Sequence, residues 1–464
     1  MNRTRRETVI GILALGSAPT WTTAGDARSG YEAFVGTWSA FVGSDSPPTR
    51  LKLVIGRDGT GRLFVIDQGE ISIEHLDLSP PRLRFEIGHP PISYAGALRE
   101  PARIVGTCVR GGQTIPLDFV RGDLYTEPPE VAFPDAPLSA SRLHALRLMA
   151  RAPAMGVAWQ FAGRHAHVLV DGHRCVDQPA AVEPSDQWHL GSVTKSMTAT
   201  LVARLIDAGA LNWHSTIKEI LAAQSADMRP EYRDVTVLHL LSHHGGLPRD
   251  SEGEFKASDL RASRLAYVHD ALRQPPSAPL GTQMIYSNAD YVVIAAMVES
   301  LTGKTWERLI ADEVFAPLRL TSAGLGPPGL PGHCDQPLGH EPSATGLRAT
   351  RSDIPAVMAP AGRVHMNLSD LLTYLQAHRD MPTQFLSRDS WAALHTPPFG
   401  GDYALGWSVG PKGALSHGGT NSKWKSEVLV DAASGLACAS VANVLNNNTQ
   451  SALRQLLSSA SRSG

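Results

Sequence analysis

The sequence has few cysteines, no surplus of charge of one sign and no long apolar run. Only four cysteines occur in 464 residues and they form no CxxC pair, which argues against a zinc ribbon or a dithiol redox site. The 42 basic and 44 acidic residues nearly balance, so the charge pattern of a nucleic-acid-binding or membrane-surface protein is missing. No apolar segment is long enough to span a bilayer. The composition therefore indicates a globular chain with room for two or three domains.

Residues 1–27 have the pattern of a secretory signal peptide. Three arginines precede an apolar run at residues 9–15, and small residues follow up to Ala27. The pair Arg5-Arg6 would also suit twin-arginine export, and a short buried helix is the alternative interpretation. We therefore expect a periplasmic or secreted protein. In such a compartment two of the cysteines could form a disulfide bond, but the sequence does not say which two.

After residues 1–27, the hydrophobic pattern and the composition divide the chain into several regions. Residues 31–125 contain short apolar runs of period two, such as GTWSAFV and RLKLVIG, separated by turn signals, which is typical of a small antiparallel barrel or sandwich. The proline-rich residues 126–139 predict a linker. Residues 140–455 mix helical and strand patterns and form the main expected domain, and residues 456–464 are predicted to be a disordered tail.

The stretch WHLGSVTKSMTATLVARLIDAG places Ser192 three residues before Lys195. Apolar residues recur at helical spacing from Val193 onward, and Gly209 is placed to end the helix. At a helix start, an offset of three puts both side chains on one face. Free N–H groups and the positive end of the helix dipole disfavour a protonated amine there, so Lys195 could take a proton from Ser192. The alternative is a capping serine followed by a surface lysine.

The Ser-x-x-Lys pattern occurs twice more, and position separates the copies. Ser215, with Lys218, is expected to cap a helix through its hydroxyl group. Ser422, with Lys425, lies in a run that alternates like a strand, where an offset of three sends the two side chains to opposite faces. Neither of these copies predicts a reactive pair.

Two later motifs could complete a site around Ser192. Tyr286-x-Asn288 stands where a second apolar helix is expected to begin. His417-x-Gly419 lies on an expected strand, where glycines would let a substrate lie against the backbone.

These motifs carry a resemblance to a known family. Ser192-x-x-Lys195, Tyr286-x-Asn288 and His417-x-Gly419, in this order, resemble the three motifs of the penicillin-recognising serine hydrolases. That family includes class C β-lactamases, D-alanyl-D-alanine carboxypeptidases, D-aminopeptidases and related esterases. The segments VTVLHLLSHHGGLP, ESLTGKTW and PAGRVHMNLSDLLTYLQAH are also similar to family segments. The resemblance covers about residues 141–447, and residues 31–125 resemble β-barrel modules fused to such hydrolases.

The resemblance implies an α/β sandwich, in which an antiparallel sheet is covered by helices and a helical subdomain lies beside it. Ser192 would lie at their junction, and a small all-β domain would precede this fold. The sheet would combine strands near residues 155–170 and 405–441. Residues 324–346, which are rich in glycine and proline, would form a loop over the substrate entrance.

The resemblance also implies roles for individual residues. Ser192 would be the nucleophile that forms an acyl-enzyme, Lys195 and Tyr286 would share the acid and base duties, and Asn288 would contact the substrate or Lys195. The backbone N–H groups of Ser192 and Thr420 would form the oxyanion hole. No metal or other cofactor is required. The expected substrate is a small molecule or peptide with an ester or amide bond, cell-wall fragments included, and the sequence indicates no oligomeric state.

One departure from the family pattern bears on the substrate. Many penicillin-binding members carry lysine where His417 stands, and its permanent charge meets a carboxylate of the substrate. A histidine is largely neutral near pH 7 unless its environment perturbs it. The sequence therefore favours an esterase or a D-amino-acid peptidase over an efficient β-lactamase.

Other interpretations concern residues outside these motifs. Ser408 matches the centre of a G-x-S-x-G nucleophile elbow, but the following PKGA predicts a hairpin where an α/β-hydrolase needs a helix. His165 and His167 could share a strand face, yet without further ligands nearby they fit exposed strand residues better than a metal site. His243 and His244 fit a packed turn.

A different class of function keeps the fold and loses the chemistry. The chain would then be a sensor of cell-wall or peptide fragments, with residues 31–125 as the binding module, although a bracing role for that region is equally open. Acylation of Ser192 distinguishes the enzyme from the sensor.

Overall fold

The computed structural model describes residues 31–42, 49–65, 69–87, 92–100, 102–110, 112–122, 136–223, 226–251, 253, 255, 259–343 and 346–463. The chain divides into two compact units, Met1–Tyr125 and Thr126–Gly464. The expected signal peptide and residues 126–135 of the expected linker lie outside the described residues.

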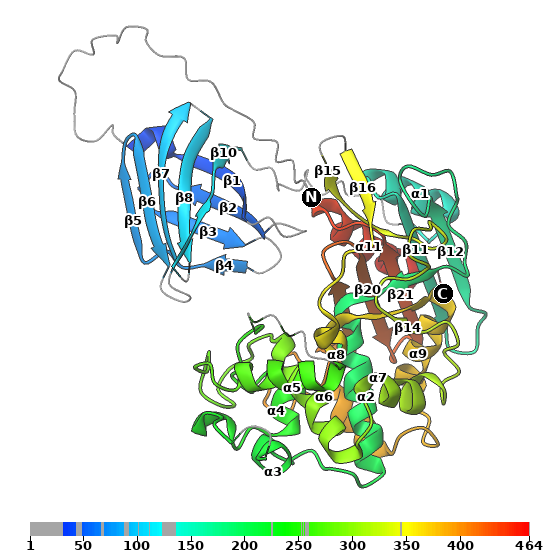
Figure 1. Cartoon of the computed structure of the whole chain (residues 1–464). Helices are drawn as coiled ribbons and strands as arrows, with labels where there is room; N and C mark the ends of the chain where they lie inside the picture. Colours follow the sequence, from blue (N-terminus) through cyan, green and yellow to red (C-terminus); the bar gives the residue numbers. More distant parts are fainter. Residues whose placement is uncertain are drawn as a thin grey trace, which may run out of the picture. The chain divides into compact units, whose positions relative to one another are not determined.

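The first unit is an all-antiparallel sheet that curls toward a barrel (Figure 1). Its strands are β1 (Gly36–Val42), β2 (Thr49–Ile55), β3 (Gly61–Val65), β4 (Gly69–Ile71), β5 (His75–Ser79), β6 (Arg82–Ile87), β7 (Ile92–Glu100), β8 (Arg103–Arg110), β9 (Gln113–Pro116) and β10 (Phe119–Arg121). They are hydrogen-bonded in the order β4-β3-β2-β1-β10-β8-β7-β6-β5, with β9 on β8. The alternation expected from the sequence is clearest in β6, where Leu83, Phe85 and Ile87 face the core. Trp38 and Phe119 pack in the same interior.

The second unit is built on a six-stranded antiparallel sheet. Its strands are β11 (Ala154–Phe161), β12 (His167–Gly172), β18 (Ser408–Val409), β19 (Leu415–Thr420), β20 (Lys425–Asp431) and β21 (Leu436–Ala442), in the order β12-β11-β21-β20-β19-β18. Strand β11 pairs with β21 from Met155 to Phe161, so the two ends of the unit meet in the middle of the sheet. The expected α/β sandwich, with strands contributed from both ends, is confirmed.

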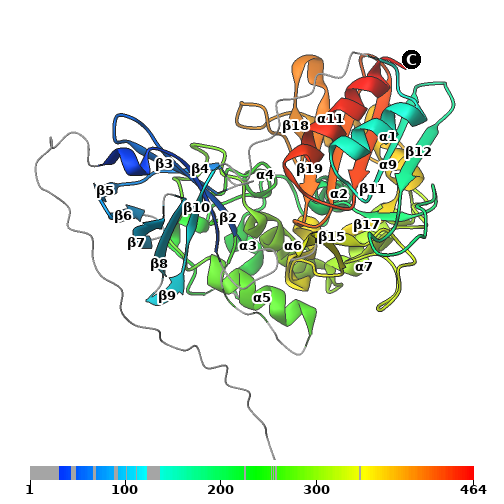
Figure 2. The ribbon, with the colours of Figure 1, turned by 90° about the horizontal axis from the view of Figure 1, so that it is seen from above.

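Two helices cover one face of this sheet. They are α1 (Ala140–Met149) and α11 (Asn447–Ser461), which lie side by side in Figure 2. The predicted disordered tail at residues 456–464 is wrong, because α11 continues to Ser461. Its apolar residues recur at helical spacing, and Leu453, Leu456 and Ala460 are fully buried against the sheet. The serine-rich composition had suggested disorder, although the apolar residues have the spacing of an amphipathic helix.

The other face of the sheet and the space beside it are helical. Helix α9 (Leu368–Asp380) packs on β11, β20 and β21, while α2 (Thr194–Asp207) packs against α10 (Arg388–His395) and leads into a helical subdomain. That subdomain contains α3 (Ile217–Leu221), α4 (Val237–Leu241), α5 (Leu260–Ala271), α6 (Asn288–Thr302), α7 (Trp306–Ile310) and α8 (Ala359–Gly362). Short helical turns occur at η1 (Tyr31–Phe34), η2 (Gly191–Val193), η3 (Pro230–Tyr232), η4 (Ala311–Phe315), η5 (Ala356–Met358) and η6 (Pro411–Gly413). Figure 1 shows α2 running from the sheet into these helices.

The glycine- and proline-rich residues 324–346, expected to be a loop, include short strands. Strand β14 (Gly324–Leu325) pairs with β17 (Val364–Asn367), which also pairs with β13 (Gln187–His189). A hairpin follows from β15 (Gly339–Ser343) and β16 (Gly346–Thr350). Between β14 and β15, Cys334 forms a disulfide bond with Cys175. The bond was not predictable, because it joins residues 159 positions apart.

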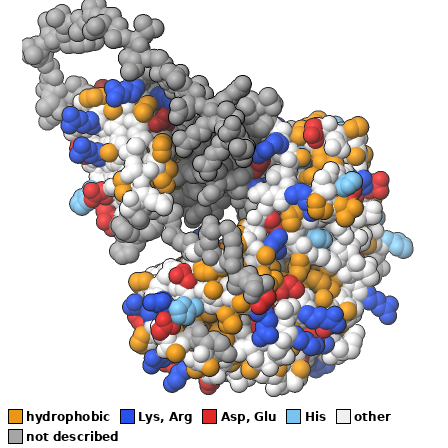
Figure 3. Space-filling view, viewed as in Figure 1, with side chains coloured by type: hydrophobic (Ala, Val, Ile, Leu, Met, Phe, Trp, Pro, Cys, Tyr) orange, Lys and Arg blue, Asp and Glu red, His pale blue; other side chains and the backbone are white. Residues whose placement is uncertain are grey.

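The surface carries no single dominant charge on the face that Figure 3 shows, where blue and red side chains are interspersed. Within the described ranges, no helix is long and apolar enough to cross a membrane.

The buried tail helix leads to a stability prediction. Leu456→Ala should lower the free energy of unfolding by about 2–5 kcal/mol, since it leaves a cavity beneath α11. Ser458→Ala, on the exposed side of the same turn, should change it by less than about 0.5 kcal/mol. Equilibrium unfolding in guanidinium chloride measures both. Equal effects of the two changes would contradict the packing of this helix.

Candidate active site

Ser192 lies where a helical turn runs into a long helix. It is the middle residue of η2, and α2 begins two residues later at Thr194. Ser192 is half-buried, whereas almost every side chain in the first two turns of α2 is fully buried. Gly209 takes a left-handed conformation just after the helix, with φ +77°. The expected helix therefore exists, and Ser192 stands at its start.

Lys195 is fully buried one turn along from Ser192 and makes three polar contacts. Its Nζ lies 3.1 Å from Oγ of Ser192, 2.7 Å from Oδ1 of Asn288 and 2.8 Å from the carbonyl oxygen of Ala361. The amine thereby joins α2 to α6 and α8. The sequence motifs predicted Ser192 and Asn288 as partners of Lys195. They did not predict the Ala361 carbonyl, although Ala361 lies in the Pro-Ala-Gly segment that resembles the family.

The environment of Lys195 disfavours its charge. Burial lowers the pKa of Lys195 to about 7. Arg249 lowers it further, whereas the carboxyl groups of Asp250 and Asp290 act in the opposite direction. The amine is therefore present in both protonation states near neutral pH.

Tyr286 and Asn288 lie at the expected start of α6. Ser287 caps this helix, because its hydroxyl accepts a hydrogen bond from the Asp290 N–H. Nζ of Lys195 lies 4.8 Å from the centre of the Tyr286 ring. Burial raises the pKa of Tyr286 above its ordinary value, and a hydrogen bond with the Ser192 side chain offsets only part of that effect. The phenol is therefore protonated at neutral pH.

Asn288 connects Lys195 to an acidic residue that the motif did not indicate. Its Oδ1 accepts from Lys195, and its Nδ2 donates to Oδ1 of Asp250 at 2.9 Å. These two contacts fix which end of the amide faces the amine.

His243 packs against the ring of Tyr286. It lies in a tight turn after α4 with φ +62°, and its ring centre is 4.4 Å from that of Tyr286. Its Nδ1 accepts from the Ser287 N–H at 3.2 Å and lies 2.8 Å from Oδ2 of Asp290. Burial lowers the pKa of His243 and raises that of Asp290, which favours a neutral pair in which Asp290 donates to Nδ1. Nε2 of His243 and Oδ1 of Asp290 find no hydrogen-bond partner among the described residues. The expected packed turn is present, and its histidine holds the Tyr286 end of α6.

Strand β19 lies directly against the turn that carries Ser192. A Cβ atom on Gly419 would lie 1.9 Å from the carbonyl oxygen of Leu190, and one on Gly191 would lie 2.2 Å from the backbone nitrogen of Thr420. Only glycine allows this approach, and Gly191 also has a positive φ of +51°. The backbone nitrogen atoms of Ser192 and Thr420 are thereby brought to the same end of the sheet.

His417 lies on β19 and is held as a neutral ring. Its Nδ1 donates to the carbonyl oxygen of Gly418 at 2.8 Å, so the ring proton is on Nδ1. Its Nε2 therefore accepts from the Tyr403 hydroxyl, at 3.1 Å. Burial lowers the pKa of His417 to about 3, and the charge on Lys195 adds to this effect. The third motif therefore supplies no positive charge at neutral pH.

The other two Ser-x-x-Lys copies are not assembled into sites. Ser215 is not the predicted cap of α3; Thr216 caps it in a capping box with Glu219, and the Ser215 hydroxyl accepts from the Asn212 N–H. Ser422 lies in the turn before β20, with φ +74°, and not on the predicted strand.

The remaining candidates are also placed. Ser408 lies on the two-residue strand β18, which turns through η6 into β19, so no nucleophile elbow forms. His167 lies on β12 and stacks on Trp159, whereas His165 is exposed in the preceding turn and not on the strand. Among the described residues, no group of three or more His, Cys, Asp or Glu side chains could hold a metal ion.

The contact between β19 and the Ser192 turn can be tested by stability. Gly419→Ala should lower the free energy of unfolding by about 1–3 kcal/mol or more, because backbone blocks the new methyl group. Gly418→Ala is the matched control, since the nearest atoms to its Cβ are the flexible ends of Glu427 and Lys425 at 3.0 and 3.1 Å. Thermal and chemical unfolding report both. A larger loss for Gly418→Ala would contradict the close approach.

Two curated relatives are similar to this chain in sequence. Penicillin-binding protein 4 of Amycolatopsis lactamdurans is 27% identical over 248 residues, which cover 52% of this chain and 62% of that protein. Unguisins hydrolase ungD of Aspergillus violaceofuscus is 28% identical over 149 residues, which cover 30% of this chain and 26% of that protein. The chain thus spans less than two thirds of the length of these curated relatives.

Solved structures share the fold of the second unit. The octameric penicillin-binding protein homologue from Pyrococcus abyssi superposes with a TM-score of 0.59 at 19% identity, over 69% of this chain and 77% of that one. The D-amino acid amidase from Ochrobactrum anthropi SV3 gives a TM-score of 0.59 at 17% identity, over 70% and 99%. A model of the Beta-lactamase family matches residues 147–459. The chain therefore belongs to the Beta-lactamase family of serine hydrolases.

Proposed function

We propose that this hydrolase cleaves an ester, amide or peptide bond through an acyl-enzyme on Ser192, and that it favours ester or D-amino-acid peptide substrates over β-lactams. The observation that carries this proposal is the placement of the Lys195 amine between three oxygen atoms. Two of them, Oδ1 of Asn288 and the carbonyl oxygen of Ala361, can only accept hydrogen bonds.

The contacts suit Lys195 as the general base. A neutral amine has two N–H bonds and one lone pair, so the two acceptors take both hydrogens and the lone pair faces Oγ of Ser192 at 3.1 Å. A pKa of about 7 keeps much of the amine unprotonated at neutral pH. In acylation the Ser192 proton would pass to Nζ as Oγ attacks the carbonyl carbon of the substrate.

Tyr286 is the better candidate for the general acid. It is protonated at neutral pH and hydrogen-bonded to the Ser192 side chain, so its proton is available to the leaving group as the tetrahedral intermediate collapses. The proton that Lys195 took from Ser192 would then restore the phenol, so that both groups return to their starting states. The oxyanion of that intermediate would accept hydrogen bonds from the backbone N–H groups of Ser192 and Thr420.

The neutral His417 supports the proposed substrate preference. Recognition of a carboxylate gains most from a permanent cation, and this ring carries none above about pH 4, because its pKa is about 3. Two fold relatives, a D-amino acid amidase and the hydrolase EstCE1 with promiscuous acyltransferase activity, are not β-lactamases by name. A substrate with a neutral group at this position is therefore favoured.

We further propose that the protein is exported to the periplasm or secreted. The sequence of residues 1–27 supports this, and so does the disulfide bond between Cys175 and Cys334, since such bonds persist in oxidising compartments.

The function can be tested by intact-mass labelling of the purified mature protein. A fluorophosphonate should add to wild type and not to Ser192→Ala, while Ser422→Ala, in a copy of the motif without a site, should label as wild type does. A penicillin should label wild type far more slowly than the fluorophosphonate. A Ser192→Ala variant that is still labelled as wild type is would contradict the role of Ser192. A folded wild type that reacts with neither reagent would favour the sensor, and fast penicillin labelling would contradict the substrate preference.

A further inference from the structure

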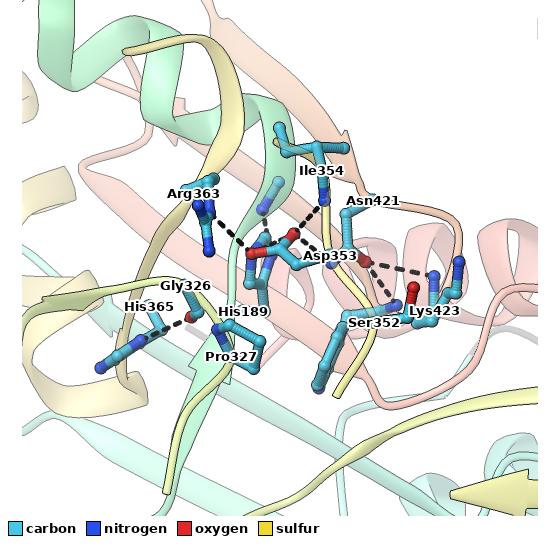
Figure 4. Close-up of polar contacts among 12 residues, drawn as sticks. His189, Gly326, Pro327, Ser352, Asp353, Ile354, Arg363, His365, Asn421 and Lys423 are labelled. Atoms are coloured by element: carbon cyan, nitrogen blue, oxygen red, sulfur yellow. Dashed lines mark hydrogen bonds and ion pairs between the residues drawn. The ribbon is translucent and has the colours of Figure 1, made fainter. Parts of the chain in front are cut away.

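A buried carboxylate, that of Asp353, lies behind the turn that carries Ser192. Its side chain is only 4% exposed and accepts four hydrogen bonds. The donors are Nε of Arg363 at 2.9 Å, Nε2 of His189 at 3.2 Å, Nδ2 of Asn421 at 2.8 Å and the backbone N–H of Ile354 at 2.8 Å. Figure 4 shows Asp353 between these side chains, which come from separate segments of the chain. None of them was singled out by the sequence motifs.

The first arm of this cluster leads to Ser192. Nδ1 of His189 accepts a hydrogen bond from the Gly191 N–H at 3.2 Å, so this nitrogen carries no proton. The ring proton is therefore on Nε2, where it is donated to Asp353. The carboxylate thus fixes the tautomer of His189, and the ring fixes the backbone of Gly191, the residue directly before Ser192.

The second arm leads to Thr420. Asn421 donates to Asp353, and its own Oδ1 accepts from the backbone N–H groups of Lys423 and Trp424 at 3.1 and 3.2 Å. The Thr420 hydroxyl donates to the Trp424 carbonyl oxygen at 2.8 Å. The Trp424 ring also stacks on His189, with ring centres 5.2 Å apart. The turn between β19 and β20 is therefore held by the same carboxylate.

The third arm reaches the segment that holds Lys195. Arg363 follows α8 directly, and its Nε donates to Asp353. Two residues earlier, the Ala361 carbonyl accepts from Nζ of Lys195. One buried carboxylate thereby connects three backbone segments that border Ser192.

We propose that Asp353 is a positioning residue for the oxyanion hole of Ser192. The inference rests on the proposed function and extends it, because the two N–H donors of the hole belong to different segments whose separation must be held closely. The glycine contacts between Gly191 and Thr420 bring the two segments together, and Asp353 holds them in register through His189 and Asn421.

A carboxylate is required in this place. Asp353 accepts from four donors, whereas an asparagine would turn its NH₂ group toward at least one of them. If that group faced His189, the ring would have to move its proton to Nδ1 and lose the Gly191 N–H. Asp353→Asn therefore alters the hole without touching Ser192, Lys195 or Tyr286.

The experiment compares Asp353→Asn with Asp186→Asn. Asp186 is equally buried, at 2% exposed, and accepts from Arg174 at 2.7 and 2.8 Å and from the Glu183 N–H, but it does not contact the Ser192 turn. For each variant, kcat and KM for an activated ester, the affinity for an arylboronic acid and the thermal stability are measured. The boronate forms a tetrahedral anion on Ser192 and so reports the oxyanion hole.

Asp353→Asn should lower kcat about 100-fold with little change in KM, and weaken boronate binding by a similar factor, as expected when an oxyanion donor is misplaced. Asp186→Asn should lose comparable stability and keep kcat within about threefold of wild type. If Asp353→Asn does not fold, His189→Phe takes its place, since it keeps a ring against Trp424 and has no acceptor for the Gly191 N–H. The same loss confined to kcat is expected.

Three results would overturn the inference. They are an unchanged kcat in the variant at Asp353, an equal loss of kcat in the variant at Asp186, and a loss confined to KM. Fluorophosphonate labelling of wild type separates this failure from that of the proposed function. If Ser192 in wild type is labelled, only the role of Asp353 falls; if it is not labelled, both fall.

Discussion

The burial of one amine, that of Lys195, is the constraint around which the second unit is arranged. Taking a lysine side chain fully out of water is costly unless its hydrogens find acceptors or its charge is lost. Here α6 supplies Asn288 and α8 supplies the Ala361 carbonyl, so two elements far apart in the chain must close on α2. The same closure leaves one direction free on the amine, and Ser192 occupies it.

The charges around the site follow from that arrangement. A lysine with a pKa near 7 cannot tolerate many cations close by, and the histidines that face it, His243 and His417, are both kept neutral by burial and by its charge. Besides Asp250, which contacts Asn288, a fixed negative charge lies farther back on Asp353, where four donors satisfy it. Such a site suits the proposed chemistry, in which Lys195 takes the proton of Ser192 and Tyr286 supplies one to the leaving group, and the neutral His417 adds no cation to it.

Sequence patterns predicted those parts of the fold and site that depend on local spacing. The offset of three between Ser192 and Lys195, the start of α6 at Asn288 and the glycines of β19 can all be read within a few residues. The supports of the site could not be predicted. Asp353 has no periodic signature, and its partners lie between 1 and 164 residues away. The tail helix was missed for another reason, since its serines hid the spacing of Leu453, Leu456 and Ala460.

The most direct test of this account is the pH dependence of Ser192 acylation, measured as the single-turnover rate of fluorophosphonate labelling between pH 5 and 9. Burial lowers the pKa of Lys195 to about 7, so the amine is protonated and inactive as a base below that pH. The account predicts a rate that rises through an apparent pKa near 7, and a Lys195→Arg variant that is slow and lacks this rise. A rate that is flat across this range, or a variant that follows the wild-type profile, would contradict it.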